Sequence, residues 1–395
     1  MSTSSKIAFY PAPISKAAMW RDLAAAAEVP ARSGGYVFRL PFESLADVEA
    51  AEQLLAGRLE RAELAGDPLP DALERGRTLR SIAQIHHRSR RIAESALRHG
   101  CTHLAIWNGG GGRRRTLVAA ARAAGLKGLF AEIAPIAGHI TLDPSGVNAD
   151  SALPRVAAYY AAWGEDHPDR TALADWRLSL KTRPGVVRSN QGTGATGQGP
   201  FVFAPLQVRG DTQIARNGGW IGSVPGFIAA LAEAARELPP GWRVVFREHP
   251  SCRIGNAEQL AGLVGDRIVV DNTTDTFELV RRAEAVVTVN SSVGLQSLLY
   301  DKPVCVLGEA NYAIPGLVSV ANGPEALSEA MQAVRDWPDD AALRAAFLSF
   351  LATEYFVRWP VAPEERVELG RKVRLRLDGR LSDWTPPPGI AAVRE

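Results

Sequence analysis

AVVTVNSSVGLQSLLYDKPVCVL, residues 285–307, contains two short apolar runs separated by a stretch with helical spacing. The runs at 285–290 and 303–307 are rich in β-branched residues and predict strands, and 293–300 predicts a helix between them. Strands that are apolar throughout are typical of a parallel sheet covered on both faces. This stretch therefore predicts one βαβ unit of a doubly wound α/β domain.

The same pattern extends through most of the second half of the chain. Further strands are predicted at 201–206 (FVFAPL), 242–248 (WRVVFRE) and 267–271 (RIVVD), and further helices at 224–237 and 275–283. Residues 201–340 thus predict a Rossmann-like domain. In such domains ligands usually bind beyond the carboxyl ends of the strands.

The first half is less regular but similar in kind. Its predicted strands are 36–40 and 102–107, and its predicted helices are 45–63, 76–99 and 114–124. Residues 183–200, rich in Gly, Ser and Thr, predict a linker. We therefore predict an α/β, GT-B-like chain with two Rossmann-like domains, 1–182 and 201–340, facing each other across a cleft. Residues 341–395 predict a helical segment that packs back on the first domain or contacts a membrane.

Composition argues against several classes of protein. The chain has 395 residues and a formal net charge of +2, too weakly basic for a typical nucleic-acid-binding protein. Its three cysteines, Cys101, Cys252 and Cys305, form neither a disulfide framework nor a C-x-x-C metal pattern. The N-terminus lacks the apolar core of a secretory signal, and no run of about 18 apolar residues occurs. We therefore expect a cytoplasmic protein.

A basic stretch near the C-terminus bears on membrane contact. Residues 371–380, RKVRLRLDGR, combine cations with apolar side chains and offer a peripheral contact with the inner membrane. The alternative is an ordinary solvated helix.

Two segments in the second half favour binding of a phosphate. Ser291 and Ser292 stand between a predicted strand and a predicted helix, where N–H groups and hydroxyls attract an anion; the alternative for either serine is a helix cap. His249, followed by Pro250, ends another predicted strand. A histidine there can donate to a phosphate oxygen, or it can be a structural surface residue.

Two carboxylates are candidates for catalysis. Asp211, within the stretch Gln207 to Ile214, follows a predicted strand and is a candidate nucleophile, base or loop cap. Glu132 ends a short apolar run and is either a general base or an ordinary carboxylate at a strand edge. No Asp-x-Asp follows a predicted strand, so we expect neither a metal nor another cofactor.

A glycine-rich loop follows the strand predicted at 102–107. Asn108 and the four glycines at 109–112 precede three arginines, 113–115. Glycines let the backbone approach a ligand closely, and arginines hold anionic groups. The Lys-Ser/Thr pair of a P-loop is missing.

Together, these segments resemble the bacterial capsular polysaccharide β-Kdo transferases over about residues 100–320. The resemblance rests on their order along the chain: the 108–112 loop, Glu132 with Leu142 to Asn148, Gln207 to Ile214, His249-Pro250, Ser291 to Gly294, and Tyr300 to Val304 followed by Gly308 to Tyr312.

The resemblance implies a retaining, metal-independent glycosyltransferase in capsular polysaccharide assembly. It implies transfer of Kdo from CMP-Kdo to a phosphatidylglycerol-type lipid or a saccharide acceptor, through an adduct on Asp211, with Glu132 facing the acceptor. His249 would serve catalysis and donor binding. The expected donor-binding residues are His249, Pro250, Ser291, Ser292, Gly294, Asn108, Gly109, Gly110 and Gln207.

Two features depart from the family pattern. Arg209-Gly210 stands where an acidic or polar pair is expected, and the chain carries one set of motifs, whereas chain-extending relatives can carry two modules. Three alternatives remain open: another CMP-nonulosonate transferase of the sialic acid type, a UDP-sugar epimerase on a similar fold, and a non-catalytic capsule export component.

Overall fold

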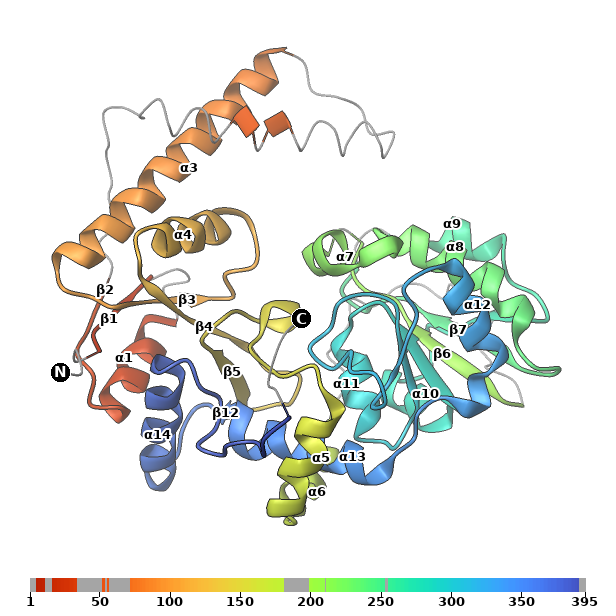
Figure 1. The fold of residues 1–395 in the computed structure, drawn as a ribbon. Helices are drawn as coiled ribbons and strands as arrows, with labels where there is room; N and C mark the ends of the chain where they lie inside the picture. The colour runs from red at the N-terminus through yellow and green to blue at the C-terminus, as the bar shows by residue number, and fades with distance from the viewer. Residues whose placement is uncertain are drawn as a thin grey trace. The chain divides into compact units, whose positions relative to one another are not determined.

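The chain forms two compact units, each built from separate stretches of sequence. The computed structural model describes residues 5–10, 16–33, 52–53, 55–56, 72–180, 199–209, 211–252 and 255–390 (Figure 1). Unit 1 takes residues from Met1–Glu132, Ile140–Ala152 and Pro360–Leu381, and unit 2 takes them from Ile133–His139, Leu153–Trp359 and Ser382–Glu395.

Unit 2 contains a six-stranded sheet with the order β11-β10-β9-β6-β7-β8. Its strands are β6 (Phe201–Pro205), β7 (Arg243–Arg247), β8 (Ile268–Val270), β9 (Ala285–Thr288), β10 (Val304–Val306) and β11 (Ser319–Val320). Each neighbouring pair is parallel. The five strands expected in the second half are confirmed, and β11 was not predicted because it is only two residues long. Strands β7 and β8 are added on one side of β6, and β9, β10 and β11 on the other, so the strand order switches between β6 and β9. The carboxyl ends of these two strands therefore form the crevice where such sheets bind ligands.

Helices cover this sheet and exclude water from both of its faces. They are α7 (Thr212–Asn217), α8 (Val224–Ala234), α9 (Ala257–Ala261), α10 (Thr276–Arg282), α11 (Ser292–Leu298) and α12 (Pro324–Gln332). Val202 on β6 and Phe246 on β7 pack with Phe227 of α8 in one buried cluster. Phe203, which points the other way from β6, is also fully buried. Burial of each such side chain contributes roughly 1.5–3 kcal/mol to the free energy of folding, and this packing fixes the strand ends from which the loops begin.

The second sheet has the order β12-β5-β4-β3-β1-β2. Its strands are β1 (Ile7–Phe9), β2 (Ala31–Ser33), β3 (His103–Trp107), β4 (Lys127–Ile133), β5 (His139–Asp143) and β12 (Phe356–Arg358). The pairs β1–β2, β1–β3 and β3–β4 are parallel. The α/β class with two Rossmann-like sheets is therefore confirmed, whereas the cleft between two domains stays a prediction.

Unit 1 confirms some of the elements expected in the first half. Its helices are α1 (Ala17–Ala26), α3 (Ala72–Arg98), α4 (Gly112–Ala123) and α14 (Arg366–Leu377). The expected strand 102–107 is β3, and the helices expected at 76–99 and 114–124 are α3 and α4. The strand expected at 36–40 and nearly all of the helix expected at 45–63 lie outside the described residues. Strands β1, β2, β4 and β5 were not predicted.

Residues 153–180 belong to unit 2, although the first domain was expected to reach residue 182. The reason is the aromatic face of α5 (Ala157–Asp166), which packs on α13 (Ala341–Phe350) beside α6 (Thr171–Ser179). The ring centroids of Tyr160 and Phe347 are 4.9 Å apart. The expected linker, 183–200, falls almost wholly outside the described residues and stays a prediction.

The final segment, expected to be helical over 341–395, is more varied. It contains α13, the edge strand β12 and α14. Residues 360–381 cluster with unit 1, where α14 packs against α1.

Candidate functional site

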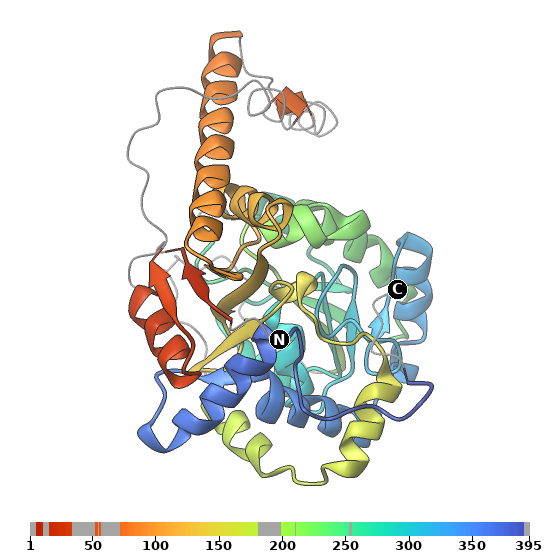
Figure 2. The ribbon, with the colours of Figure 1, turned by 60° about the vertical axis from the view of Figure 1, so that its left-hand side comes forward.

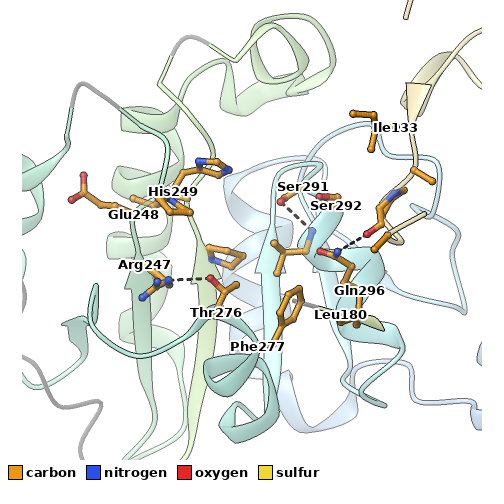
Figure 3. A pocket seen from close by; sticks show the side chains of 17 residues that line it. Ile133, Leu180, Arg247, Glu248, His249, Thr276, Phe277, Ser291, Ser292 and Gln296 are labelled. Carbon is orange, nitrogen blue, oxygen red and sulfur yellow. Dashed lines mark hydrogen bonds between the residues drawn. The ribbon is translucent and has the colours of Figure 1, made fainter. Parts of the chain in front are cut away.

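A cavity of about 300 Å³ opens at the carboxyl ends of the strands of unit 2 (Figure 3). This volume is at the lower end of the range for small-molecule sites, about 300–1,000 Å³. The loops after β6, β7 and β9 and the start of α10 contribute to its walls. The lining residues are Ile133, Ala134, Pro135, Ala137, Leu180, Pro205, Leu206, Arg247, Glu248, His249, Pro250, Thr276, Phe277, Ser291, Ser292, Val293 and Gln296.

Four of the sequence-predicted residues meet at this cavity: His249, Pro250, Ser291 and Ser292. They come from two loops about 40 residues apart in sequence, one after β7 and one after β9. The cavity thus lies beside the β6–β9 crevice that the strand order defines.

The His249 imidazole is held in a defined tautomer. Its Nδ1 accepts a hydrogen bond from the Ser251 N–H at 3.1 Å, so the proton of the neutral ring lies on Nε2. The Glu248 carboxylate beneath it is buried and accepts from the Asn256 N–H at 2.6 Å and from Asn272 Nδ2 at 3.3 Å. These bonds anchor the loop, so His249 presents an Nε2–H donor from a rigid support.

The Ser291 side chain caps a helix, as the alternative interpretation expected. Its Oγ accepts from the Val293 N–H at 3.2 Å. Its N–H donates to Thr288 Oγ1 at 3.1 Å, and its carbonyl oxygen accepts from the Tyr312 hydroxyl. Ser292, by contrast, is exposed and lines the cavity. Ser291 therefore fixes the turn, and Ser292 is the serine that is exposed at the cavity.

Gly294 has a packing role in this turn. It is buried and does not line the cavity. A Cβ at this position would collide with the Tyr312 hydroxyl and lie 2.8 Å from Thr288 Cγ2. The absence of a side chain therefore lets α11 approach Tyr312.

Asp211 and Gln207 lie next to the cavity without lining it. Asp211 is the N-cap of α7: its Oδ1 accepts from the Gln213 N–H at 2.9 Å, and its Oδ2 accepts from Gln207 Nε2 at 3.3 Å. Gln207 Nε2 also donates to Asn290 Oδ1 at 3.0 Å. Because Asn290 precedes Ser291, these hydrogen bonds connect the Asp211 carboxylate to the turn that contains Ser291 and Ser292.

Arg247 is a cationic residue in the cavity wall; it lies in the strand expected at 242–248 but was not among the expected site residues. Its Nε donates to Thr276 Oγ1 at 3.0 Å, and its Nη1 donates to the Thr274 carbonyl oxygen. Burial lowers the pKa of Arg247, while Asp271 and Asp275 act in the opposite direction. A guanidinium remains protonated in proteins, so the cavity carries a fixed positive charge. Its place at the carboxyl end of a predicted strand could have identified Arg247 as a site residue from the sequence.

In unit 1, the structure brings Glu132 together with the glycine-rich loop. Asn108 has a left-handed backbone, φ 65°, and its Nδ2 donates to Glu132 Oε2 while its Oδ1 accepts from the Gly110 N–H at 2.8 Å. Gly109, with φ 81°, leaves room for the Phe130 ring, which would lie 2.8 Å from an added Cβ. A carboxylate and a shaped loop thus meet at the carboxyl ends of β3 and β4.

No group of three or more His, Cys, Asp or Glu side chains suited to a metal occurs among the described residues. Metal independence stays a prediction. Within the same part of the chain, no helix has both the length and the apolar character needed to cross a bilayer.

Comparison with known proteins identifies the segment that carries the cavity loops. Residues 185–358 match the sequence profile of the family described as capsule polysaccharide biosynthesis protein. The match covers less than half of the chain. The match confirms the resemblance to a capsular polysaccharide family over residues 185–358, which include the loops that carry His249 and Ser291.

Two curated relatives share part of the chain. Protein FixF of Sinorhizobium fredii is 31% identical over 261 residues, which are 64% of this chain and 60% of that protein. Capsule polysaccharide export protein KpsS of Escherichia coli is 35% identical over 126 residues, 30% of this chain and 32% of that protein. The chain therefore spans less than two thirds of either relative.

A solved structure with partial similarity is described as Thermosulfurimonas dismutans KpsC, beta Kdo 2,7 transferase. It is 16% identical, with a TM-score of 0.42, covering 72% of this chain and 90% of that one.

Proposed function

We propose that this chain is a glycosyltransferase of capsular polysaccharide assembly that uses a CMP-activated sugar acid, CMP-Kdo, as its donor. One observation carries the proposal: His249-Pro250 and Ser291-Ser292, the two elements expected to bind CMP, line the same cavity. The family match of residues 185–358 supports the capsule setting. The motif resemblance described above supports CMP-Kdo.

The proposed cavity residues have distinct tasks at the donor phosphate. The His249 Nε2–H donates to a phosphate oxygen, and the Ser292 hydroxyl offers a second donor. The fixed charge of Arg247 favours the anion that leaves as CMP. Oriented donors and a cation of this kind stabilise developing charge without reorganising, which is the task that a metal performs in other transferases.

Retention of configuration requires two displacements in this proposal. An Asp211 carboxylate oxygen bonds to the anomeric carbon as the bond from that carbon to the CMP phosphate oxygen breaks. The acceptor hydroxyl then attacks the same carbon, its proton passes to a base, and Asp211 is released as carboxylate. Each Asp211 oxygen accepts one hydrogen bond in the structure, which leaves each oxygen a further lone pair for the attack.

Glu132 is the proposed base for the acceptor hydroxyl. Its carboxylate already accepts a hydrogen bond from Asn108 Nδ2, which holds it in place in unit 1. We propose a lipid of the phosphatidylglycerol type or a saccharide as the acceptor, reached at the cytoplasmic face of the inner membrane.

Nucleotide preference tests the proposal most directly. Thermal unfolding is followed in the presence of CMP, UDP, GDP or ADP, without metal and then with Mg²⁺. We expect CMP alone to stabilise the chain without metal, by about 2.7 kcal/mol at a hundred times its dissociation constant. His249→Ala should abolish this shift, whereas His99→Ala, at an exposed position of unit 1, should preserve it. Selective stabilisation by UDP would exclude the proposal and favour a UDP-sugar epimerase.

Turnover separates the remaining alternatives. CMP-Kdo generated in the assay should be consumed with formation of a Kdo-linked acceptor. Use of CMP-sialic acid in its place would assign the chain to another CMP-nonulosonate transferase. CMP-Kdo binding without transfer would favour the non-catalytic export component that the sequence left open, an alternative that the name of the Escherichia coli relative also suggests.

A further inference from the structure

The basic stretch 371–380 exposes only two of its five cations, Arg374 and Arg380. Lys372 and Arg376 are buried. Arg376 Nε donates to the Leu142 carbonyl at 2.7 Å, and its Nη1 donates to the Leu381 carbonyl at 2.6 Å. Arg371 is bound to Glu368 on the same helix. The structure therefore favours a packing role for this stretch, and a cationic surface has to be sought elsewhere.

Helix α3 carries the largest formal positive charge of the described helices. Its 27 residues contain seven arginines, two glutamates and no lysine or aspartate, so its formal charge is +5. The whole chain is only +2, so the remaining residues sum to −3. The arginines are Arg75, Arg77, Arg80, Arg88, Arg90, Arg91 and Arg98.

The arginines of α3 form a row on its solvent side. Arg80, Arg91 and Arg98 are exposed and recur at intervals of eleven and seven residues, which returns them to nearly the same side of a helix. Eighteen residues of α-helix separate the ends of this row, a length of about 27 Å. Ala93 and Ala96, on the opposite side, are buried. Both views show α3 beside α4 near its C-terminal end and extending beyond it (Figures 1 and 2).

Acidic side chains neutralise little of this row. Glu94 is shared by three arginines, with N···O distances of 3.9 Å to Arg90, 3.3 Å to Arg91 and 3.9 Å to Arg98. One carboxylate offsets at most one of these charges, and exposed pairs of this kind bind weakly. Arg88 broadens the same exposed face. The helix therefore keeps a surplus of positive charge toward solvent.

We propose that the arginine row of α3 is a docking surface for anionic phospholipid headgroups. Basic clusters on an amphipathic helix are typical of binding to anionic lipid surfaces. A row about 27 Å long meets several headgroups at once, and each guanidinium can hold a phosphate through two hydrogen bonds. Residues 72–98 contain no Phe, Trp or Tyr, the side chains that stack on the bases of single-stranded nucleic acids. The inference does not depend on which sugar the donor cavity binds.

Vesicle binding tests this surface. The full chain is sedimented with vesicles of phosphatidylcholine alone, or of phosphatidylcholine and phosphatidylglycerol in equal amounts. We expect binding to the anionic vesicles only, weakening as salt rises. The triple variant Arg80→Gln, Arg91→Gln, Arg98→Gln should bind on the order of 100-fold more weakly. Circular dichroism checks that the variant keeps the helix content of the parent.

A matched variant shows whether binding depends on the arginine row itself or only on the net charge of the chain. Arg236→Gln, Arg282→Gln and Arg366→Gln remove the same charge from exposed positions on other helices and should preserve binding. An equal loss in both triple variants, or no binding by the parent chain, would overturn the proposal. If soluble glycerol phosphate competes for the row as strongly as vesicles do, the row binds a free phosphate compound. If an anionic polysaccharide displaces the vesicles, the row binds a polymer. Either result overturns the lipid assignment.

Discussion

The Tyr312 hydroxyl donates a hydrogen bond to the carbonyl oxygen of Ser291, the residue that caps α11 at the edge of the cavity. Tyr312 is buried, and Thr288 Oγ1 accepts from the Ser291 N–H at 3.1 Å on the other side of the same residue. Both backbone groups of Ser291 are therefore fixed by side chains. The position of the neighbouring Ser292 depends on a residue that does not itself line the cavity.

Replacing Tyr312 with phenylalanine should weaken CMP binding as well as stability. The change removes one of two hydrogen bonds to the Ser291 carbonyl, which still accepts from the Gly294 N–H at 3.0 Å, so the cost should be about 0.5–1.5 kcal/mol. Tyr160→Phe is the matched control, because the Tyr160 hydroxyl donates to the Pro154 carbonyl at 2.9 Å, away from the cavity. Urea unfolding should show comparable losses for both variants, while the CMP-induced thermal shift falls only for Tyr312→Phe. Equal CMP shifts would reduce Tyr312 to a structural residue.

Replacing Gly294 with alanine should destabilise unit 2 through steric conflict. The added methyl would meet the Tyr312 hydroxyl and lie 2.8 Å from Thr288 Cγ2, an overpacking that costs roughly 1–3 kcal/mol. In the double variant with Tyr312→Phe, the closest conflict disappears. The two changes should therefore cost less together than the sum of their separate effects. Simple additivity in urea unfolding would contradict this account of Gly294.

Variants of Asp211 can separate helix capping from catalysis. Asparagine caps a helix about as well as aspartate, so Asp211→Asn should leave the free energy of unfolding nearly unchanged, whereas Asp211→Ala should cost about 0.5–2 kcal/mol. Only the carboxylate can act as the proposed nucleophile, so Asp211→Asn should lower kcat by roughly a thousandfold or more. Turnover of CMP-Kdo near the parent rate in Asp211→Asn would mean that Asp211 is a cap alone.

The buried imidazole of His103 should make stability fall in mild acid. Its Nε2 lies 2.9 Å from the Leu377 carbonyl oxygen, and burial lowers its pKa below the ordinary 6.5. In the window between the two values the unfolded chain binds more protons than the folded chain, so this contribution to stability is present above pH 6.5 and is lost as the pH falls from 6.5 through the folded pKa. The difference in urea stability between the parent and His103→Gln should therefore shrink with falling pH over this window. A difference that is constant with pH would show that His103 does not titrate in this way.

The fold could be predicted best from the sequence where strands and helices alternate most regularly. The five strands expected in unit 2 are buried on both faces, and their continuous apolar runs, such as Ala285–Thr288, identify them without tertiary information. Strands β1 and β2 are three residues long, and β4 has Lys127 and an exposed Ile133 at its ends, so local patterns do not reveal them. The strand β12 has only three residues and lies inside the segment that was expected to be helical over 341–395.

In the candidate site too, some residues could be predicted from the sequence, whereas the contacts between them could not. A strand end followed by His249 or by Ser291 is visible in sequence, because the carboxyl edge of a parallel sheet gathers such residues. The link from Gln207 to Asn290 joins residues 83 positions apart, and the bond from Tyr312 to Ser291 depends on how closely α11 approaches. Contacts of this kind are set by the register between elements, which no local pattern contains.

The division of unit 1 among three stretches of sequence has a consequence for the order of its maturation on the ribosome. Helix α1 is synthesised before its partner α14, which follows almost all of the chain that forms unit 2. At Gly370, α14 approaches the Ala26 carbonyl of α1 so closely that a side chain would not fit. Until that contact forms, the nascent first unit exposes the surface of α1 that α14 will cover. Unit 1 can therefore be completed only after most of the chain of unit 2 has been made.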